Sequence, residues 1–574
     1  MNNKFQLIQR FLDDNNYKFY LITNNDIHLN ESPNLSQKDI YNISGFDCSH
    51  GYLLILTDQI VFFTDSRYTL AASKFFPKSI KVYDIRNNPL SKYIITLGSN
   101  FRGIVDPKLI STQQFLDLNK HLSPVKITIH PLKAQIYQKV YFPDFNRSYP
   151  FSLPKNYIPR SYDKNIQWAK NRIHSEGLLI WNNAHVAYLL NIRSFELDNS
   201  TKPFAGLFIP KKKAKPIIIS NNANLNNLSK IKNNFQLLSF EKFKSFLKRN
   251  NFKKIEFEFK YTNFEIYYSL KKFLQIFESP IDIDKYLSKK TKVEKNNITK
   301  CHYEDGLIMT KFLIQVKTKK LKFKNEYHLS NALYELRKEG VNFFRNSFDY
   351  ISAFDANGSI VHYRPTPNNA TIFKDQSLLL IDSGAHYLEG TTDVTRMLKL
   401  YSPIKKKIKS TYTYLLKSLL KLEKTHFPKN LLASDLDNFI RSFLQKHNIS
   451  YGHGTGHGVG YFNDVHEKYP IISALSNQKI LNGNFFSIEP GFYLPNEFGL
   501  RIENLYFAKK FDTHIKLEGV TLVPYELDLI NWKLINAQEK LSIKKYHQKI
   551  YHTFQGQLEP VYRSYFEKYL INKL

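Results

Sequence analysis

The hydrophobic pattern of the first 150 residues predicts an α/β domain. Apolar residues recur at helical spacing from Phe5 to Leu12. Short apolar and β-branched runs then predict strands at Phe19–Ile22, Tyr52–Leu56 and Ile60–Thr64. Because helix and strand signals alternate, residues 1–150 are expected to form one α/β unit that ends in a connector rich in proline and aromatic residues.

The same order of signals starts again after this connector, which predicts a second domain over residues 151–292. A helix is expected around Asn165–Ile173, with strands at Gly177–Trp181, Phe204–Ile209 and Pro216–Ile219. The offset between the two halves is about 150–160 residues, so the pattern predicts two copies of one fold. Residues 222–251 are rich in Lys, Asn and Leu, and we expect an exposed helix face there.

A third domain is expected over residues 293–574. Helical periodicity covers Lys300–Val316, Glu326–Lys338, 403–423 and 432–447. Residues 347–363 predict a strand and a loop. From about residue 519 the chain carries a further segment in which no catalytic motif is found. The fold class is therefore α/β (α+β), with two related α/β domains before a third domain.

Two aspartates lie in a predicted hairpin of the third domain. An apolar run ends on Asp382, a Gly-containing turn follows, and Asp393 lies in the β-branched run Thr391–Thr395. A hairpin that closes near residues 387–388 would place Asp382 opposite Asp393, with Cβ atoms about 5 Å apart. Two like charges so close favour a divalent cation between them, although two solvated strand carboxylates would also fit this stretch alone.

A second acidic pair and a glycine-rich histidine segment follow. Glu489 ends a predicted strand that stops at Pro490–Gly491, and Glu503 lies within a predicted return strand, 500–507. Buried carboxylates without partners are costly, and both lie in apolar surroundings. His457 lies between the pairs in the segment Gly-His-Gly-Thr-Gly-His-Gly-Val-Gly, 452–460. Two Asp, two Glu and one His suit a two-metal site that activates a shared water.

The composition adds a strong positive charge without a concentrated basic surface. The 574 residues carry 82 Lys and Arg against 50 Asp and Glu, a formal net charge of +32. The basic residues are dispersed along the chain, so a solvated basic surface is favoured over nucleic-acid binding. The two cysteines, Cys48 and Cys301, predict no disulfide framework and a reducing compartment. The first residues lack the apolar core of a signal peptide, and no apolar run is long enough to span a membrane, so we expect a cytoplasmic protein.

The motifs around these residues resemble those of the pita-bread metallopeptidases, which include methionine aminopeptidase, prolidase and aminopeptidase P. The segments DSGAHYLEGTTDVTR (382–396), HGTGHGVG (453–460), EPGFY (489–493) and FGLRIEN (498–504) are most similar to the long, three-domain Xaa-Pro aminopeptidases. This resemblance implies two creatinase-N-like domains before the catalytic domain. It also implies a metalloaminopeptidase that removes the first residue of peptides whose second residue is proline, and a homodimer.

The resemblance also assigns roles to individual residues. Asp382, Asp393, His457, Glu489 and Glu503 would bind two divalent ions, most suitably Mn²⁺, since the set combines carboxylates with one imidazole. Glu489 would also act as a general base. His362 and His466 match histidines that bind substrate, and one of them could stabilise a developing oxyanion. His453 and Arg501 are further substrate-binding candidates, although for both a structural role is at least as well supported.

The chain departs from the family pattern beside one of these histidines. The family follows its Val-His-Glu with Gly-Pro, whereas Lys468 and Tyr469 stand here after Glu467. Tyr461 replaces a small residue. Both changes leave the metal-ligand types untouched and concern the peptide-entry loop.

Two other functions compete with this prediction. A prolidase would cleave only dipeptides. The two expected N-terminal domains and the amino-acid sequences of the motifs argue against a prolidase. A non-catalytic relative that binds peptides, histones or RNA would have lost metal ligands, whereas all five are present here. Comparing hydrolysis of a tripeptide and a dipeptide with proline second separates the three functions.

Overall fold

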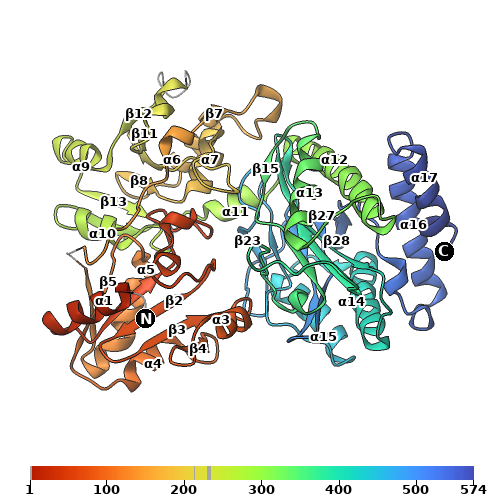
Figure 1. Ribbon diagram of the computed structural model, residues 1–574. Coiled ribbons are helices and arrows are strands. Elements are labelled where there is room, and N and C mark those ends of the chain that lie inside the picture. Colours follow the sequence, from red (N-terminus) through yellow and green to blue (C-terminus); the bar gives the residue numbers. More distant parts are fainter. Residues whose placement is uncertain (1–2, 133–134, 213, 229–233) are drawn as a thin grey trace. The chain divides into compact units, whose positions relative to one another are not determined.

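The structure is a computed structural model that describes residues 3–132, 135–212, 214–228 and 234–574 (Figure 1). The chain forms two compact units, residues 1–283 and residues 284–574, here called the N-terminal and C-terminal units. The predicted division into three domains, with borders at 150 and 292, remains a prediction, and each unit is described below by itself.

The first part of the N-terminal unit is a six-stranded sheet with the order β4-β3-β2-β1-β5-β6. Its strands are β1 (Phe19–Thr23), β2 (Tyr52–Leu56), β3 (Ile60–Thr64), β4 (Lys81–Asp84), β5 (Arg102–Val105) and β6 (Thr128–Pro131). The helices are α1 (Asn3–Asp14), α2 (Asp39–Ser44), α3 (Thr69–Phe75), α4 (Leu90–Thr96) and α5 (Thr112–Leu122). Alternate residues of β1 enter two separate cores, so both faces of the sheet are covered.

The second part repeats this topology. Its sheet has the order β12-β11-β10-β8-β13-β14. The strands are β8 (Gly177–Ile180), β10 (Gly206–Pro210), β11 (Ile217–Ile219), β12 (Gln236–Leu238), β13 (Lys254–Phe257) and β14 (Gln275–Glu278). The helices are α6 (Tyr162–Lys170), α7 (Asn183–Leu190), α9 (Phe240–Arg249) and α10 (Phe264–Leu270), and the short strands β7 (Phe151–Ser152) and β9 (Ile192–Arg193) pair with each other.

Parallel and antiparallel pairs follow the same sequence in both sheets, which confirms the predicted repeat. β1 pairs antiparallel with β2 and parallel with β5, and β8 pairs antiparallel with β10 and parallel with β13. The exposed helix predicted within 222–251 is α9, although β12 and a 3₁₀ turn at Ala223–Asn227 precede it. Residues 229–233 of that segment lie outside the described residues.

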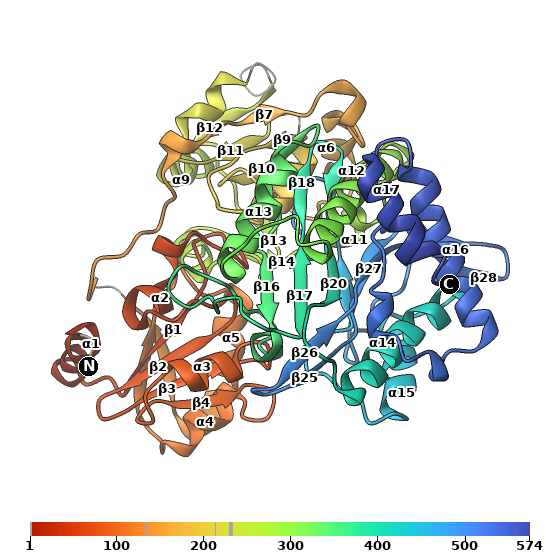
Figure 2. The same cartoon turned by 45° about the vertical axis from the view of Figure 1, so that its right-hand side comes forward.

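The C-terminal unit packs long helices against antiparallel sheets (Figure 2). After α11 (Ile283–Ser288), the helices are α12 (Lys292–Lys317), α13 (Glu326–Lys338), α14 (Lys406–Lys424) and α15 (Ala433–Gln445). One three-stranded sheet joins β16 (Ile351–Phe354), β17 (Leu378–Ser383) and β20 (Val394–Lys399). Another joins β15 (Phe343–Asn346), β18 (Ala385–Tyr387) and β19 (Gly390–Thr391).

A six-stranded sheet of the same unit has the order β21-β28-β27-β24-β22-β23. Its strands are β21 (Phe427–Pro428), β22 (Gly456–Gly458), β23 (Glu467–Ile472), β24 (Phe485–Ile488), β27 (Asn504–Lys510) and β28 (His514–Gly519). The hairpin of β25 (Gly491–Leu494) and β26 (Phe498–Arg501) stands apart from it. The return strand predicted at 500–507 is therefore two strands, since Leu500 pairs with Phe492 in β25 while Asn504 pairs with Ile488 in β24.

The predicted register of the aspartate hairpin was wrong by two residues. Asp382 pairs with Thr395, and the turn lies at Leu388–Glu389, because Tyr387 pairs with Gly390. Gly390 directly follows the two turn residues and starts the return strand. Asp393 thus stands two positions before the partner of Asp382, which is a diagonal rather than an opposed position.

The final helices pack on α12 within the C-terminal unit. α16 (Ala537–Phe554) and α17 (Pro560–Phe566) bury Ile550, Phe554 and Phe566 against Leu307 and Ile314 of α12 (Figure 2). This extension covers the outer face of α12 and contributes none of the predicted site residues.

Candidate active site

Five acidic and histidine side chains from five different places in the C-terminal unit converge on one point. Asp382 comes from β17, and Asp393 directly precedes β20. His457 lies on β22, and Glu489 directly follows β24. Glu503 lies between β26 and β27. All five are the residues that the sequence predicted as metal ligands.

The metal-binding atoms of these residues lie close enough to share ions. Three groups each have ligand atoms within 4.8 Å of one another, and their members are Asp393, His457 and His466; His457, Glu489 and Glu503; and Asp382, Asp393 and Glu503. Asp393, His457 and Glu503 each belong to two groups. Such overlap is what a two-ion site with shared ligands requires.

The imidazole of His457 is oriented with one nitrogen toward the carboxylates. Its Nδ1 lies 3.0 Å from the carbonyl oxygen of Gly458, so this nitrogen donates a hydrogen bond when the ring is neutral. Nε2 then carries a lone pair and lies 3.3 Å from Glu489 and 3.6 Å from Asp393. A hydrogen bond from the other ring nitrogen is the usual way in which a metal-binding histidine is fixed.

Two glycines allow the site strands to approach so closely. A Cβ atom on Gly456, next to His457, would overlap the backbone carbonyl of Ser487 in β24. A Cβ atom on Gly384, two residues after Asp382, would overlap the carbonyl of Thr392, next to Asp393. Both positions therefore require glycine for steric reasons.

The acidic residues carry more negative charge than the surrounding protein compensates. Oδ1 of Asp382 and Oε1 of Glu503 are buried and have no hydrogen-bond partner. Burial, together with Glu503, Asp382 and Glu489, raises the pKa of Asp393 well above its ordinary value. Burial, with Glu489 and Asp382, likewise raises the pKa of Glu503.

Glu489 differs from its neighbours. Burial alone would raise its pKa, but the hydrogen bond and charge of His457 and the nearby His453 and Arg501 hold the pKa at about 2. The set therefore contains two carboxyl groups whose negative charge is strongly disfavoured and one whose negative charge is favoured.

These residues fit two divalent cations. Four carboxylates and one imidazole are the donor types that hard or borderline divalent ions prefer. The two unpaired buried oxygens and the raised pKa values are the features that a bound cation would correct. The donor set contains no thiolate, so it does not select a soft metal.

Arg501 holds the first aspartate in place. Its Nη2 donates a hydrogen bond of 2.5 Å to Oδ2 of Asp382, its Nη1 bonds the hydroxyl of Tyr493 at 2.7 Å, and its Nε bonds Oγ1 of Thr395 at 3.2 Å. The same Thr395 hydroxyl donates to Oε2 of Glu503 at 2.9 Å. Arg501 is therefore a buried residue that orients a carboxylate, and its substrate-binding role remains a prediction.

Thr395 and Tyr493 did not emerge from the sequence as site residues. Thr395 could have been predicted, because it lies two positions after Asp393 and alternate residues of a strand share a face. Tyr493 follows Glu489 across a turn, and no spacing rule indicated that its hydroxyl would join Arg501 to His453.

The three other histidines lie at different distances from the carboxylates. The ring of His466 stands edge to face against that of His457, with 4.3 Å between the ring centroids. His453 bonds the hydroxyl of Tyr493 through Nε2 at 2.8 Å, and burial lowers its pKa to about 4. His362 is half-buried, and the carbonyl of its neighbour Val361 lies 3.5 Å from Nη2 of Arg501.

Two of the unusual residues near His466, Tyr461 and Tyr469, lie in the protein interior, whereas Lys468 is half-buried. Tyr469 is buried in β23, and its hydroxyl donates to the carbonyl of Lys479 at 2.7 Å. The Tyr461 ring is buried too, and its hydroxyl accepts a hydrogen bond from Asn297 of α12. The larger side chains thus fill space behind the loop between β22 and β23.

Family models match most of the chain. Residues 4–138 match the creatinase/prolidase N-terminal domain, residues 297–510 match metallopeptidase family M24, and residues 513–572 match the C-terminal region of peptidase M24. The chain therefore carries a creatinase N-terminal domain and a metallopeptidase family M24 domain. All five converging residues lie within the segment that matches the M24 model.

Relatives of this M24 chain carry the name Xaa-Pro aminopeptidase. Xaa-Pro aminopeptidase 1 of Dictyostelium discoideum is 25% identical over 96% of the chain and 92% of that protein. A putative Xaa-Pro aminopeptidase of Saccharomyces cerevisiae is 37% identical, but the match covers 50% of the chain and 40% of that protein. The chain thus spans less than half of the yeast relative and nearly all of the Dictyostelium one.

Solved structures confirm the fold of the M24 chain. An X-prolyl aminopeptidase of Caenorhabditis elegans, described as a cytosolic enzyme with a di-nuclear active site, matches with a TM-score of 0.87 and 21% identity, covering 96% of this chain and 95% of that one. A prolidase of Pyrococcus horikoshii covers 64% of this chain with a TM-score of 0.51 and 24% identity. The fold over nearly the whole chain is therefore that of the nematode protein, whereas the prolidase matches only part of it.

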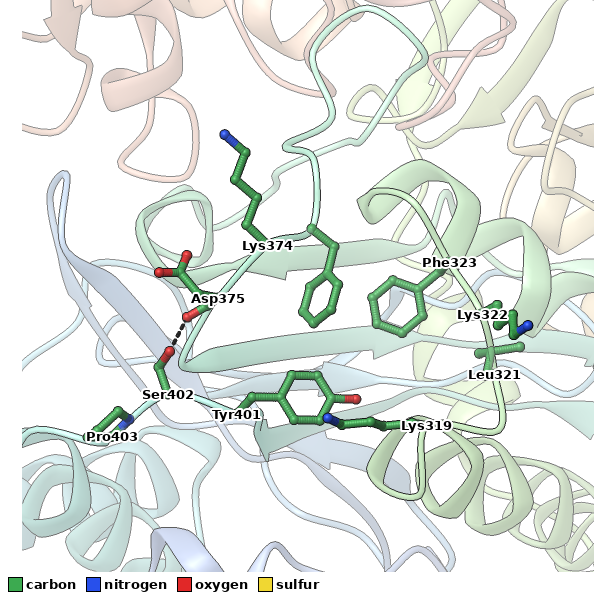
Figure 3. A pocket seen from close by; sticks show the side chains of 10 residues that line it. Lys319, Leu321, Lys322, Phe323, Lys374, Asp375, Tyr401, Ser402 and Pro403 are labelled. Atoms are coloured by element: carbon green, nitrogen blue, oxygen red, sulfur yellow. Dashed lines mark hydrogen bonds between the residues drawn. The ribbon is translucent and has the colours of Figure 1, made fainter.

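A separate cavity of about 530 Å³ lies at the other end of the strands that carry the aspartates (Figure 3). It lies between residues 373–375, before β17, residues 401–403, after β20, and residues 319–323, after α12. Its lining contains lysines and aromatic side chains and none of the predicted site residues.

Among helices in the described ranges, none is long and apolar enough to cross a membrane.

Proposed function

We propose that this M24 chain is a Xaa-Pro aminopeptidase, which hydrolyses the bond between the first residue of a peptide and a following proline. The observation that carries the proposal is the convergence of Asp382, Asp393, His457, Glu489 and Glu503 on one point, with two buried oxygens lacking partners. The names of the full-length relatives supply the substrate class.

Five residues would hold the two ions. They are Asp382, Asp393, His457, Glu489 and Glu503, whose ligand atoms lie within reach of one another. When bound, the ions polarise the scissile carbonyl and lower the pKa of an attacking water. Mn²⁺ is the ion that we propose, because this mixture of carboxylates and one imidazole suits it.

The chain's own residues perform the proton transfers. Glu489 takes a proton from the attacking water as its oxygen adds to the carbonyl carbon, and the proton then passes to the proline nitrogen as the C–N bond breaks. An N–H of His466 or His362 donates to the developing oxyanion. Arg501 keeps Asp382 in position throughout through its bond to Oδ2.

The substrate's tertiary amide explains why a dedicated site is needed. A bond to proline carries no N–H, and the proline ring restricts the chain around it. His453, held by Tyr493 close to Arg501, is proposed to line the space for the substrate. We further propose a homodimer and a cytosolic location, which rest on the resemblance to the long enzymes and on the description of the nematode relative.

Activity on matched peptides tests the proposal. The metal-loaded protein should release the first residue from a tripeptide with proline second and should not cleave the same tripeptide with alanine second. Activity on the Xaa-Pro dipeptide alone would identify a prolidase instead. No hydrolysis of either substrate by protein that contains two ions per chain would contradict the proposal.

A further inference from the structure

A completely buried lysine lies directly behind the proposed substrate-binding loop. Lys290 precedes α12, and its side chain has no exposed surface. Nζ lies 2.9 Å and 2.7 Å from the two carboxylate oxygens of Glu467, so the pair is bidentate. Glu467 is itself buried and stands next to His466 in the chain.

Two anchors from the same segment hold this loop, defined here as residues 459–466 between β22 and β23. Lys290 holds the residue that follows its end, and Asn297 of α12 holds Tyr461 near its start through a hydrogen bond of 2.9 Å. In the middle, the backbone N–H and carbonyl of Asn463 bond Oγ1 of Thr391. His466 lies between Asn463 and Glu467, which are both fixed by these contacts.

The strand geometry connects Glu467 to the position of His466. Glu467 is the first residue of β23 and pairs with Gly458, the residue after His457. His466 lies in the bend that leads into β23, so the hold of Lys290 on the Glu467 carboxylate fixes the backbone next to the His466 ring. The two imidazole rings are indeed in contact, with 4.3 Å between their centroids.

The segment that carries Lys290 also supports the strand that leads to Glu489. The N–H of Lys290 donates to the carbonyl of Gly483 at 3.0 Å, and the side-chain amide of Asn484 donates to the carbonyl of Ser288 at 3.2 Å. These residues directly precede β24, whose end places Glu489. The segment before α12 therefore contacts both strands beside the site.

Stability alone does not account for this pair. A buried ion pair contributes little net stability, because removing two charges from water costs about as much as their attraction returns. Burial raises the pKa of Glu467 to about 7 even though Lys290 opposes the shift. An arrangement with so little energetic benefit is better explained by the geometry that it fixes.

We propose that Lys290 is a positioning residue, which holds Glu467 and thereby sets the orientation of His466 toward the substrate. This inference rests on the proposed function, since it assigns His466 to the peptide side of the site. The lysine touches neither the substrate nor the five proposed ligands.

A variant series with a matched control tests the inference. Lys290→Met removes the charge but keeps the length, and Lys290→Met with Glu467→Met removes both partners of the pair. Lys317→Met is the control, because Lys317 lies at the other end of α12 and pairs with Glu526 and Asp528, away from the loop. Each protein is loaded with Mn²⁺, and its metal content, melting temperature, kcat and KM are measured.

The expected result separates positioning from folding. Lys290→Met should keep two ions and lose about 10- to 100-fold in kcat with little change in KM, since a misplaced group costs this much. The double variant should recover melting temperature but not kcat. Lys317→Met should keep kcat. Recovery of kcat in the double variant, or an unchanged kcat in Lys290→Met, would overturn the inference.

A crystal structure of Lys290→Met gives a readout that does not depend on activity. The His457–His466 ring contact should be lost or lengthened beyond 4.3 Å. An unmoved His466 ring would overturn the inference even if kcat falls. If the wild-type protein cleaves no Xaa-Pro peptide, the proposed function fails, whereas the ring position still decides whether Lys290 orients His466.

Discussion

Two buried clusters of charged residues, one in each unit, differ in how their charge is compensated. In the N-terminal unit, Nζ of Lys139 lies 2.7 Å from Asp39 and 2.7 Å from Asp106. Hydroxyl groups of Tyr137 and Tyr141 donate to the same two carboxylates. Within the described residues, neither aspartate has a buried oxygen without a partner.

In the C-terminal unit, the protein does not compensate the charge of the carboxylate cluster in this way. Its four carboxylates face one guanidinium, that of Arg501, which bonds only Asp382 among them. Two carboxylate oxygens have no partner. The first cluster is thus completed by the protein, whereas the second requires a cation from outside, and this difference separates a structural charge cluster from a metal site.

The largest expected effect comes from removing one charge from the carboxylate cluster of the C-terminal unit. Asp393→Asn and Glu489→Gln should each lower kcat/KM by about 10³-fold or more, because metal ions stabilise the transition state by several kcal/mol. The metal-free Asp393→Asn variant should melt no lower than the metal-free wild type, since a buried carboxyl group whose charge is disfavoured is gone. Glu489→Gln should melt lower, because it removes a charge that His457 and Arg501 favour. Activity assays and calorimetry measure both quantities.

The matched variant in the other cluster should behave in the opposite way. Asp39→Asn leaves Lys139 with one carboxylate partner fewer, and breaking a buried pair costs about 3–5 kcal/mol. The variant should unfold more easily and keep kcat while it is folded. Near-normal activity of Asp393→Asn, or lost activity in folded Asp39→Asn, would contradict the distinction between the clusters.

A smaller effect is expected from His466→Ala. A hydrogen-bond donor to a developing oxyanion contributes on the order of 10²–10³ in rate. The variant should lose kcat/KM on a tripeptide with proline second and retain two ions by elemental analysis. Because His466 also lies within reach of Asp393 and His457, loss of an ion would show that it is a ligand instead.

The smallest effect concerns protonation in the N-terminal unit. Burial lowers the pKa of His28 to about 3, and its ring stacks on Trp181. In the unfolded chain, the His28 imidazole binds a proton near pH 6.5, whereas in the folded chain it stays neutral at this pH. The free energy of unfolding therefore falls as the pH drops below 6.5. The loss should reach about 2 kcal/mol at pH 5.

His28→Phe tests this pH dependence. The variant should be less stable at pH 7, since the bond from the ring to the Trp181 carbonyl is lost. It should then lose about 2 kcal/mol less than the wild type between pH 7 and pH 5. Denaturant unfolding followed by tryptophan fluorescence measures this difference, and equal pH slopes in the two proteins would show that His28 does not titrate on unfolding.

The sequence predicted most elements of the fold because their local signals were strong. β2, β3 and α13 have the predicted bounds, since each has a clear apolar period and a polar boundary. The hairpin register was missed because it depends on which two residues form the turn, and the sequence around Leu388–Glu389 allowed more than one choice.

The site was predicted as far as residue types allowed. The five ligand candidates converge as their residue types indicated, and each lies on or directly beside a strand, although the sequence did not predict the strand ends at Asp393, His457 and Glu503. Arg501, Tyr493 and Thr395 form a network across strands far apart in sequence, which no local period encodes. The ion pair of Lys290 could not be predicted for the same reason, because its partner Glu467 lies 177 positions away in the sequence.

Metal titration of the protein during peptide hydrolysis tests the central claim most directly. Protein stripped of metal should be inactive on a tripeptide with proline second, and added Mn²⁺ should restore turnover in step with the uptake of two ions per chain. Asp393→Asn should take up fewer ions under the same conditions. Full turnover by protein that elemental analysis shows to be free of metal would contradict the account.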